Sequence, residues 1–227
     1  MADLSGGDER VKELEKEAEK LFAQLKTLAL EVSKNRKASG EKLAKLVTAE
    51  INNLAMPNAK FVIEQKVADS NTPKNYTSTG LDEIAILFAG HVGAAPLSLS
   101  KVASGGELSR VMLALEVVIA EAEPIGTYIF DEVDAGVGGK AAIEVGRRLH
   151  QLAQHAQVIV VTHLPQVAAW ADSHFVVTKN NDGTVSQSDV RQVSGEERVE
   201  EVARMLAGLE NSASAREHAT ELLSLKV

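Results

Sequence analysis

Residues 8–54 have the composition and periodicity of one long helix that needs a partner. This stretch contains no proline and a single glycine, Gly40. Its apolar residues recur at alternating intervals of three and four, the spacing of a coiled-coil seam, and the phase is lost near residues 35–40 before it resumes at Leu43. We expect the helix to end before Pro57, since proline cannot continue it. The seam consists of Val11, Leu14, Ala18, Leu21, Leu25, Leu28 and Val32.

A coiled-coil seam requires a second helix, but no other segment of the chain has a heptad repeat. The partner helix would lie in another chain or in sequence outside these 227 residues. The alternative is an amphipathic helix that lies on the domain's own sheet. We expect residues 1–56 to form a coiled-coil arm segment and residues 57–227 to form a lobe. A basic cluster on the arm is more typical of a solvated helix face than of a DNA contact: Lys34, Arg36, Lys37, Lys42 and Lys45.

The part of the chain after Pro57 alternates between strand and helix patterns. The alternation between Gly106 and Thr178 implies parallel strands joined by crossover helices. The expected fold class is therefore α/β, with a mainly parallel sheet, flanking helices and the long N-terminal helix. The predicted strands cover residues 61–66, 84–88, 127–130, 158–161, 175–178 and 184–190, and a hairpin turn at residues 181–183 joins the last two.

Composition narrows the function classes. Hydrophobic residues make up 44% of the chain and charged residues 25%, which is ordinary for a globular protein. The absence of cysteine excludes disulfides and thiolate metal sites. No apolar run approaches the length of a membrane span and no signal peptide opens the chain, so we expect a cytoplasmic protein without a membrane partner. A net charge of −8 disfavours nucleic-acid binding through overall charge, although it leaves room for a local basic patch.

Two glycines open a predicted helix in the segment Ser104, Gly105, Gly106 and Glu107. Glycine lets the backbone approach a ligand closely, and a helix N-terminus presents free N–H groups with a partial positive charge. The Ser104 hydroxyl adds a further hydrogen-bonding group. These features suit a phosphate group, but serine and glycine are also favoured in a simple helix cap.

Two acidic residues, Asp131 and Glu132, follow the apolar strand at residues 127–130. Open parallel sheets bind ligands at the carboxyl ends of their strands, where both side chains would lie. Asp131 could hold Mg²⁺, directly or through water, because this ion takes hard oxygen ligands. Glu132 could then accept a proton from an attacking water. The simpler interpretation is a polar strand end, where acidic residues are common.

Two more polar features follow. The glycine-rich turn at residues 133–140 fails the G-x-x-x-x-G-K-[ST] pattern of a phosphate-binding loop, because Asp134 replaces a required glycine and Ala141 a required serine or threonine. Lys140 is then an ordinary residue in the first turn of a helix. His163 follows a predicted buried strand and could reach a γ-phosphate, although a lone histidine is usually structural or solvated.

Taken in order, these segments resemble the ABC ATPase superfamily. Residues 104–107 are similar to its signature motif, and residues 128–132 to its Walker B strand with the adjacent catalytic glutamate. Asp134 stands at the D-loop position and His163 at the switch-histidine position. The sequence looks most like the RecN branch, bacterial SMC-like proteins of DNA double-strand break repair. The segments with this closer resemblance are residues 101–110, 129–139 and 161–168.

The resemblance implies the C-terminal lobe of an ABC-type ATPase head that uses ATP and Mg²⁺. Two heads would sandwich two ATP molecules. Each site would take Asp131, Glu132 and His163 from one subunit and the signature residues 104–107 from the other. ATP binding would join the heads and hydrolysis would reopen them. The family's phosphate-binding loop precedes the coiled coil and is absent from this sequence, so the chain by itself is expected to be inactive.

The implied partners are the N-terminal P-loop lobe of the same protein, a second copy of the head, and DNA, with the recombinase RecA as a further candidate. The implied role is DNA repair and recombination in a cytoplasmic, nucleoid-associated protein. An alternative is the nucleotide-binding subunit of an ABC transporter, which shares the motifs but has no coiled coil at this place. A third is a non-enzymatic assembly module, which the intact pair Asp131 and Glu132 disfavours.

Overall fold

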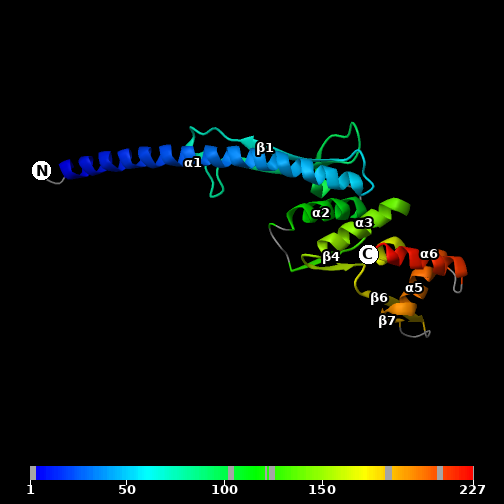
Figure 1. The fold of residues 1–227 in the computed structure, drawn as a ribbon. Coiled ribbons are helices and arrows are strands. Elements are labelled where there is room, and N and C mark those ends of the chain that lie inside the picture. The colour runs from blue at the N-terminus through cyan, green and yellow to red at the C-terminus, as the bar shows by residue number, and fades with distance from the viewer. Residues whose placement is uncertain are drawn as a thin grey trace.

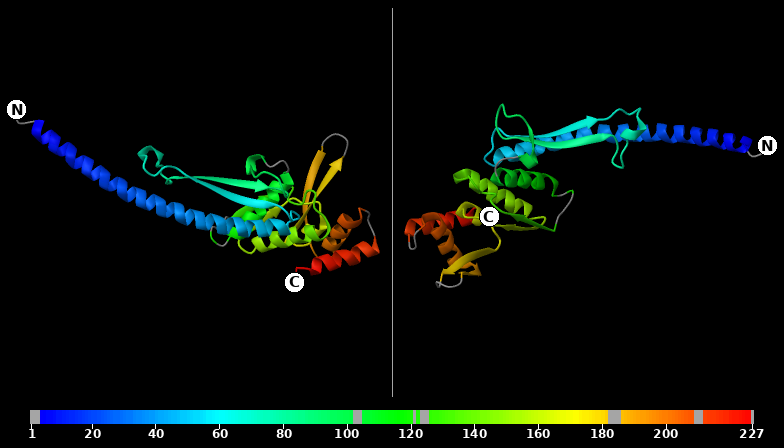
Figure 2. Two further views of the ribbon diagram at one scale, coloured as in Figure 1. Left: turned by 90° about the horizontal axis from the view of Figure 1, so that it is seen from above. Right: turned by 180° about the vertical axis from the view of Figure 1, so that it is seen from behind.

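The computed structural model describes residues 4–101, 105–120, 122, 126–181, 186–208 and 212–226. A long helical arm, with the N-terminus at its far end, projects from a lobe of helices and short strands (Figure 1). A β-hairpin runs along the inner part of the arm, and the C-terminal helices lie at the end of the lobe remote from the tip of the arm (Figure 2). No helix in the described ranges is long and apolar enough to cross a bilayer.

The arm is one unbroken helix, α1 (Leu4–Asn53). The change of phase in the sequence pattern does not interrupt this helix but moves its apolar stripe to another side. In the outer half the seam faces solvent, with Leu21 57% and Leu28 60% exposed, whereas Val47 and Ile51 in the inner half are fully buried in the lobe. The alternative of an amphipathic helix that lies on the chain's own sheet is therefore wrong for the outer half of the arm.

The hairpin beside the arm pairs β1 (Lys60–Val67) with β2 (Asp82–Ala89) in antiparallel register. The sequence predicts both strands, but the apolar alternation of β2 does not mark a covered face along its whole length, since Ile84 is 45% and Ile86 39% exposed. Strand β3 (Leu97–Ser98) extends the β2 edge. Two short 3-10 helices complete this part, η1 (Pro73–Asn75) and η2 (Leu99–Lys101).

A buried carboxylate fastens the hairpin to the arm. Asp82 accepts hydrogen bonds from the Ser33 hydroxyl, from Gln65 Nε2 at 2.9 Å and from Arg36 Nη1 at 3.0 Å. Burial alone would raise the pKa of Asp82, but the hydrogen bonds from Ser33, Gln65 and Arg36 outweigh it and hold this pKa below its usual value. Arg36, one residue of the basic cluster, is thus engaged within the chain.

The lobe is a β4–α3–β5 crossover flanked by α2 and α4. Strands β4 and β5 are parallel, and their inward side chains, such as Phe130, pack against the helices, where Leu113 and Val145 join Ile51 of the arm in one core cluster. The side chain of Arg148 on α3 also pairs with Glu50 at the base of the arm. The bounds are α2 (Gly105–Ile119), β4 (Thr127–Phe130), α3 (Gly139–Leu152), β5 (Gln157–Val160) and α4 (Pro165–Ala168).

The C-terminal part forms a second, smaller cluster. A hairpin of β6 (His174–Asn181) and β7 (Ser186–Val193) leads into α5 (Gly195–Ala207) and α6 (Ala213–Ser224). Both helices pack against α4 through small and medium apolar residues: Ala169, Val202, Ala203, Ala219 and Leu222.

The sheet differs from the expectation of a mainly parallel one. In the described part of the chain only β4 and β5 pair in parallel, while β1–β2–β3 and β6–β7 are separate antiparallel sheets. Strand β6 follows a strand and a helix, as an added parallel strand would, but it pairs with β7. A hairpin between neighbours in sequence needs no crossover and satisfies the same backbone groups locally.

Candidate nucleotide site

Asp131 and Glu132 begin a tight turn at the carboxyl end of β4. The φ angle of Glu132 is +55°, in the left-handed region that residues other than glycine rarely adopt. The Asp131 carboxylate accepts a hydrogen bond from the Glu132 N–H at 2.9 Å, and the Glu132 carbonyl accepts one from the Ala135 N–H at 3.0 Å. Both acidic residues remain exposed. Backbone strain of this kind is concentrated at functional sites.

The N-terminus of α2 lies directly against this turn, and glycine makes the approach possible. A methyl group added at the buried Gly106 would lie 3.1 Å from the carbonyl oxygens of Glu132 and Ala135. One added at Gly105 would lie 2.8 Å from Oε2 of Glu132. The glycine pair and the acidic pair are therefore neighbours within one chain.

Two further side chains of α2 bind the backbone of the same turn. The Ser109 hydroxyl donates to the Asp131 carbonyl at 3.0 Å. Arg110 Nη1 donates to the Ala135 carbonyl at 2.8 Å and to the Val133 carbonyl at 3.5 Å. The turn is thus held from the helix side by two residues to which the sequence analysis assigned no role.

Arg110 is buried, and this burial lowers the pKa of its guanidinium. The negative charges of Glu107 and Asp134 oppose that shift. The guanidinium stays protonated at neutral pH because the pKa of arginine starts so high. A permanent positive charge therefore lies beneath the turn.

Asp134 and His163 meet where β5 ends. Asp134 is only 2% exposed, and its carboxylate accepts a hydrogen bond from the Thr162 hydroxyl. The Nδ1 atom of His163 lies 3.6 Å from Oδ2 of Asp134, while the His163 side chain is 74% exposed. Thr162 belongs to the motif in the sequence, but its role as the partner of Asp134 appears only in three dimensions.

The structure therefore gathers most of the predicted site residues at one edge of the lobe. Ser104 lies outside the described residues. The sequence signal that could have identified Arg110 is its spacing. It follows Gly106 by four positions, so the two residues lie on the same face of α2. The predicted residues that the structure brings together are Gly105, Gly106, Glu107, Asp131, Glu132, Asp134 and His163.

The arrangement fits a magnesium–nucleotide ligand. The N-terminus of α2 carries a partial positive charge, and glycine at its first two positions allows a ligand to approach the backbone closely, which suits a phosphate. Among the described residues no three acidic or histidine side chains form a metal-binding group. Asp131 alone fits a Mg²⁺ ion that takes its remaining ligands from phosphate oxygens and water.

Comparisons with known proteins bear on this arrangement. Residues 9–186 match the family model described as the RecF/RecN/SMC N terminal domain. The chain belongs to this family. The DNA repair protein RecN of Streptomyces coelicolor is 53% identical over 214 residues, which cover 91% of this chain and 37% of that protein. The DNA repair protein RecN of Bacillus subtilis is 36% identical over 230 residues, which cover 97% of this chain and 40% of that protein.

The RecF/RecN/SMC chain described here thus spans well under half the length of these relatives. A similar solved structure is the Smc head domain with a coiled coil and joint from Pyrococcus yayanosii. It has a TM-score of 0.53 and 23% identity, and covers 88% of this chain and 37% of that chain. This likeness supports the fold, an SMC head of mixed α and β structure.

Proposed function

We propose that the chain is the C-terminal half of an SMC-like ATPase head that acts in DNA double-strand break repair and recombination. The observation that carries the proposal is the meeting of the α2 N-terminus, the Asp131–Glu132 turn and the Asp134–His163 pair at one edge. This equipment suits phosphates, a metal ion and an attacking water. The relatives that bear the name DNA repair protein RecN supply the biological setting.

Each residue has a distinct part in the proposed hydrolysis. Bound Mg²⁺ would neutralise developing charge on the phosphates. The N–H groups at Gly105 and Gly106 would bind phosphate oxygens of the ATP held by the second head. In the chain's own site, Asp131 would hold the ion, the exposed Glu132 carboxylate would accept the proton of the attacking water, and His163 would reach the outermost phosphate.

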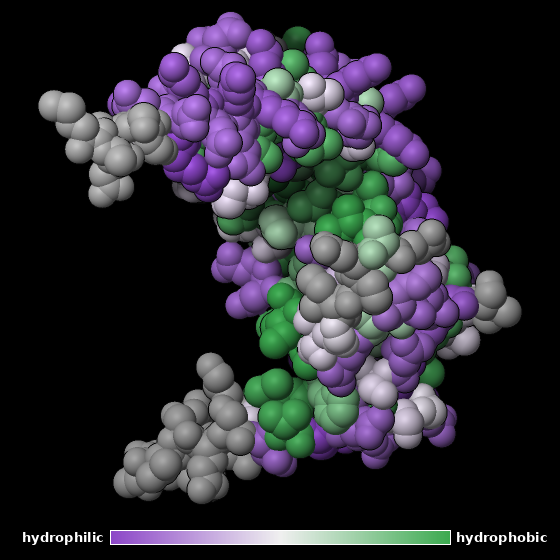
Figure 3. Space-filling view, turned by 90° about the vertical axis from the view of Figure 1, so that its left-hand side faces the viewer, coloured by the Kyte–Doolittle hydropathy of each residue, from purple (hydrophilic) through white to green (hydrophobic). Residues whose placement is uncertain are grey.

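The remainder of each site comes from an N-terminal P-loop lobe. The 227 residues contain no phosphate-binding loop, and the outer face of the β4–β5 pair is bare: Ile129 is 73% and Val161 61% exposed. Parallel strands occur almost only where both faces are covered, which supports a covering lobe. A hollow with hydrophobic residues at its base lies between the hydrophilic arm and the far end of the lobe (Figure 3).

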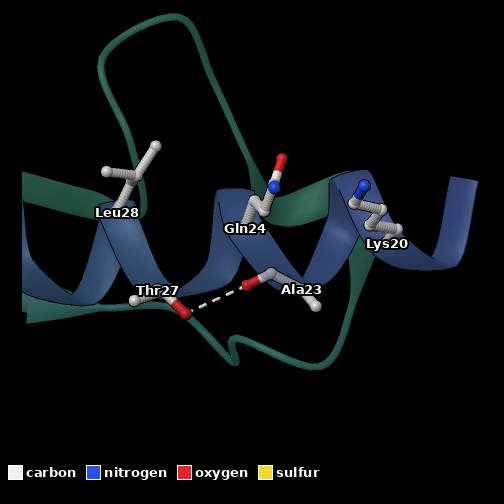
Figure 4. A pocket seen from close by; sticks show the side chains of 5 residues that line it. All are labelled: Lys20, Ala23, Gln24, Thr27 and Leu28. Atoms are coloured by element: carbon white, nitrogen blue, oxygen red, sulfur yellow. Dashed lines mark hydrogen bonds between the residues drawn. The ribbon is translucent and has the colours of Figure 1, made fainter. Parts of the chain in front are cut away.

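The arm is proposed to pair with a second helix in a coiled coil. Its exposed seam supports this, because a row of large apolar side chains in water stabilises a structure only when it is covered. An open hollow on the outer half of α1 is lined by Lys20, Ala23, Gln24, Thr27 and Leu28, and the Thr27 hydroxyl donates to the Ala23 carbonyl there (Figure 4). Leu28 belongs to the seam, so a partner helix would fill this hollow.

A second head completes the proposal. Two heads share two ATP molecules, ATP binding joins them and hydrolysis separates them, while the arms transmit the motion to DNA. RecA remains a proposed partner, and the nucleoid a proposed location. An ABC transporter subunit is not favoured, since an arm of 50 residues leads directly into the lobe and the relatives are DNA repair proteins.

Turnover of ATP by the chain alone and by the chain joined to its P-loop lobe tests the proposal. We expect Mg²⁺-dependent hydrolysis only from the joined protein, and we expect Glu132→Ala to abolish it. Turnover by the chain alone above its own Glu132→Ala control would refute the incomplete site. Absence of turnover in a well-folded joined dimer that binds ATP would refute the ATPase assignment.

A further inference from the structure

A buried carboxylate in the turn after Glu132 has no part in the reaction proposed above. Asp134 is 2% exposed, which is costly for an ionised group unless its neighbours compensate. The compensation comes from the Thr162 hydroxyl, which donates to Oδ2, and from the positive charge of Arg110. Asp134 is therefore held by the Thr162 hydrogen bond and stabilised by the nearby charge of Arg110.

The Thr162 hydroxyl is itself fixed in direction. Its oxygen accepts a hydrogen bond from the Leu164 N–H at 3.0 Å, and its proton is directed to Asp134. Since Thr162 precedes His163 directly, the strand end that carries the histidine also carries the anchor of the carboxylate. Small shifts of β5 would move both together.

The orientation of the His163 ring follows from this anchor. Nδ1 lies 3.6 Å from the same Oδ2 atom that Thr162 binds, so a slight rotation of the exposed ring completes a hydrogen bond. The two ring nitrogens lie on different edges of the imidazole, so Nε2 points away from Asp134 when Nδ1 faces it. A carboxylate that accepts from Nδ1–H decides which nitrogen carries the proton.

We propose that Asp134 is a positioning residue for His163: anchored by Thr162, it keeps the proton on Nδ1 and presents Nε2 to the phosphate. This inference rests on the proposed function for the role of His163, but the ring geometry stands on Asp134 and Thr162 alone. It gives the D-loop aspartate a task within its own subunit, distinct from the metal at Asp131 and the base at Glu132.

The first test measures which ring nitrogen of His163 carries the proton in protein without nucleotide. The full-length protein with ¹⁵N-labelled histidine would be studied by NMR, with the His163 signals assigned through His163→Gln. We expect the neutral ring to carry its proton on Nδ1, and Asp134→Asn to shift the population toward Nε2–H, because the amide can donate to Nδ1. A wild-type ring protonated on Nε2, or a tautomer indifferent to Asp134→Asn, would overturn the inference while leaving the proposed function intact.

The second test measures ATP turnover of the same protein with two matched substitutions of Thr162. Thr162→Val removes the anchor and should lower kcat roughly 10- to 100-fold with little change in KM, as loss of a supporting partner often does. Thr162→Ser keeps the hydroxyl and should restore activity to near the wild-type value. Equal effects of Val and Ser would mean that only packing matters and would reject the positioning role.

The variant His163→Gln distinguishes a failure of the proposed function from a failure of the positioning role of Asp134. If it lowers kcat and Asp134→Asn does so as well, the inference is supported. If it lowers kcat and Asp134→Asn does not, the positioning role falls and the proposed function survives. If it leaves kcat unchanged, His163 has no role in hydrolysis and the inference falls with that assignment.

Discussion

Arg110 of α2 reaches across to the turn after Glu132 and donates a hydrogen bond from Nη1 to the carbonyl oxygen of Ala135 at 2.8 Å. The helix whose N-terminus would bind phosphate is thereby tied to the turn that carries Asp131 and the proposed base Glu132. Since Arg110 is only 6% exposed, the bond is shielded from water. The two halves of the proposed chemistry are held as one unit.

Replacing Arg110 should therefore destabilise the lobe. Arg110→Met would leave the Ala135 carbonyl without this donor and Asp134 without a neighbouring positive charge, at an expected cost of about 1–3 kcal/mol in the free energy of unfolding. Arg147→Met on the exposed side of α3, where Arg147 forms an ion pair with Glu144, is the control and should change stability by about 0.5 kcal/mol at most. Urea unfolding of both variants measures the difference. Equal losses of stability in the two variants would contradict the anchoring role of Arg110.

Glu132 combines a strained backbone with a catalytic assignment, so two substitutions should separate stability from activity. Glu132→Gly relieves the φ of +55° and should raise the free energy of unfolding by up to about 1 kcal/mol while it abolishes hydrolysis. Glu132→Gln keeps the strain and should slow hydrolysis by about 10²- to 10⁴-fold with ATP binding preserved. Thermal melts and single-turnover assays would show this. Near wild-type hydrolysis by Glu132→Gln would remove its assignment as the base.

The glycine pair offers a matched comparison at the start of α2. Gly106→Ala pushes a methyl group against the backbone of Glu132 and Ala135 and should cost about 1–3 kcal/mol of stability. Gly105→Ala meets only the mobile end of the Glu132 side chain, so the fold should persist while the displaced carboxylate loses activity. Calorimetry and turnover of both variants check this. A stable, active Gly106→Ala protein would be incompatible with the close approach.

The attachment of the hairpin to the arm should depend on pH. Because the pKa of Asp82 is lowered in the folded state, its ionised form contributes stability above the ordinary value of about 3.8, and this contribution is lost as pH falls through the lowered pKa. Asp82→Asn should remove this acid-dependent part and weaken the attachment at neutral pH. Hydrogen exchange of the β1 and β2 amides, followed from neutral pH down to well below the ordinary value of about 3.8, provides the measurement. An unchanged pH profile in Asp82→Asn would assign the dependence to other groups.

The features that could be read from sequence are those encoded by adjacent residues or by a period. The heptad run gives α1, and the apolar run before Asp131 gives β4 with its carboxylates at the correct end. The catalytic roles of these carboxylates remain predictions, but the structure places Glu132 directly beside Gly105 and Gly106.

The features that could not be read are single polar contacts between distant residues. Ser33 and Asp82 are 49 positions apart, and Glu50 and Arg148 are 98 apart, so neither pair leaves a periodic trace. The antiparallel pairing of β6 with the strand that follows it is confirmed as the sequence predicts, whereas the implied place of β6 among the parallel strands is wrong for a related reason. The apolar pattern predicts a strand but not which strand lies beside it.

The sharing of sites between two heads is the central claim, and mixed dimers test it most directly. Full-length protein would carry either Ser104→Arg, which blocks the signature loop, or Glu132→Gln, which removes the base. Each homodimer then has two defective sites. In a mixed dimer with sites built across subunits, one site carries both lesions and the other carries neither.

After subunit exchange of equal amounts, about half of the dimers are mixed, so ATP turnover should recover to roughly a quarter of the wild-type rate if the sites act independently. A tagged pull-down would establish that exchange is complete. The proximity of Gly105 to Glu132 within one chain makes the opposite outcome a real alternative. Turnover that stays at the level of the two parent variants would contradict the shared site.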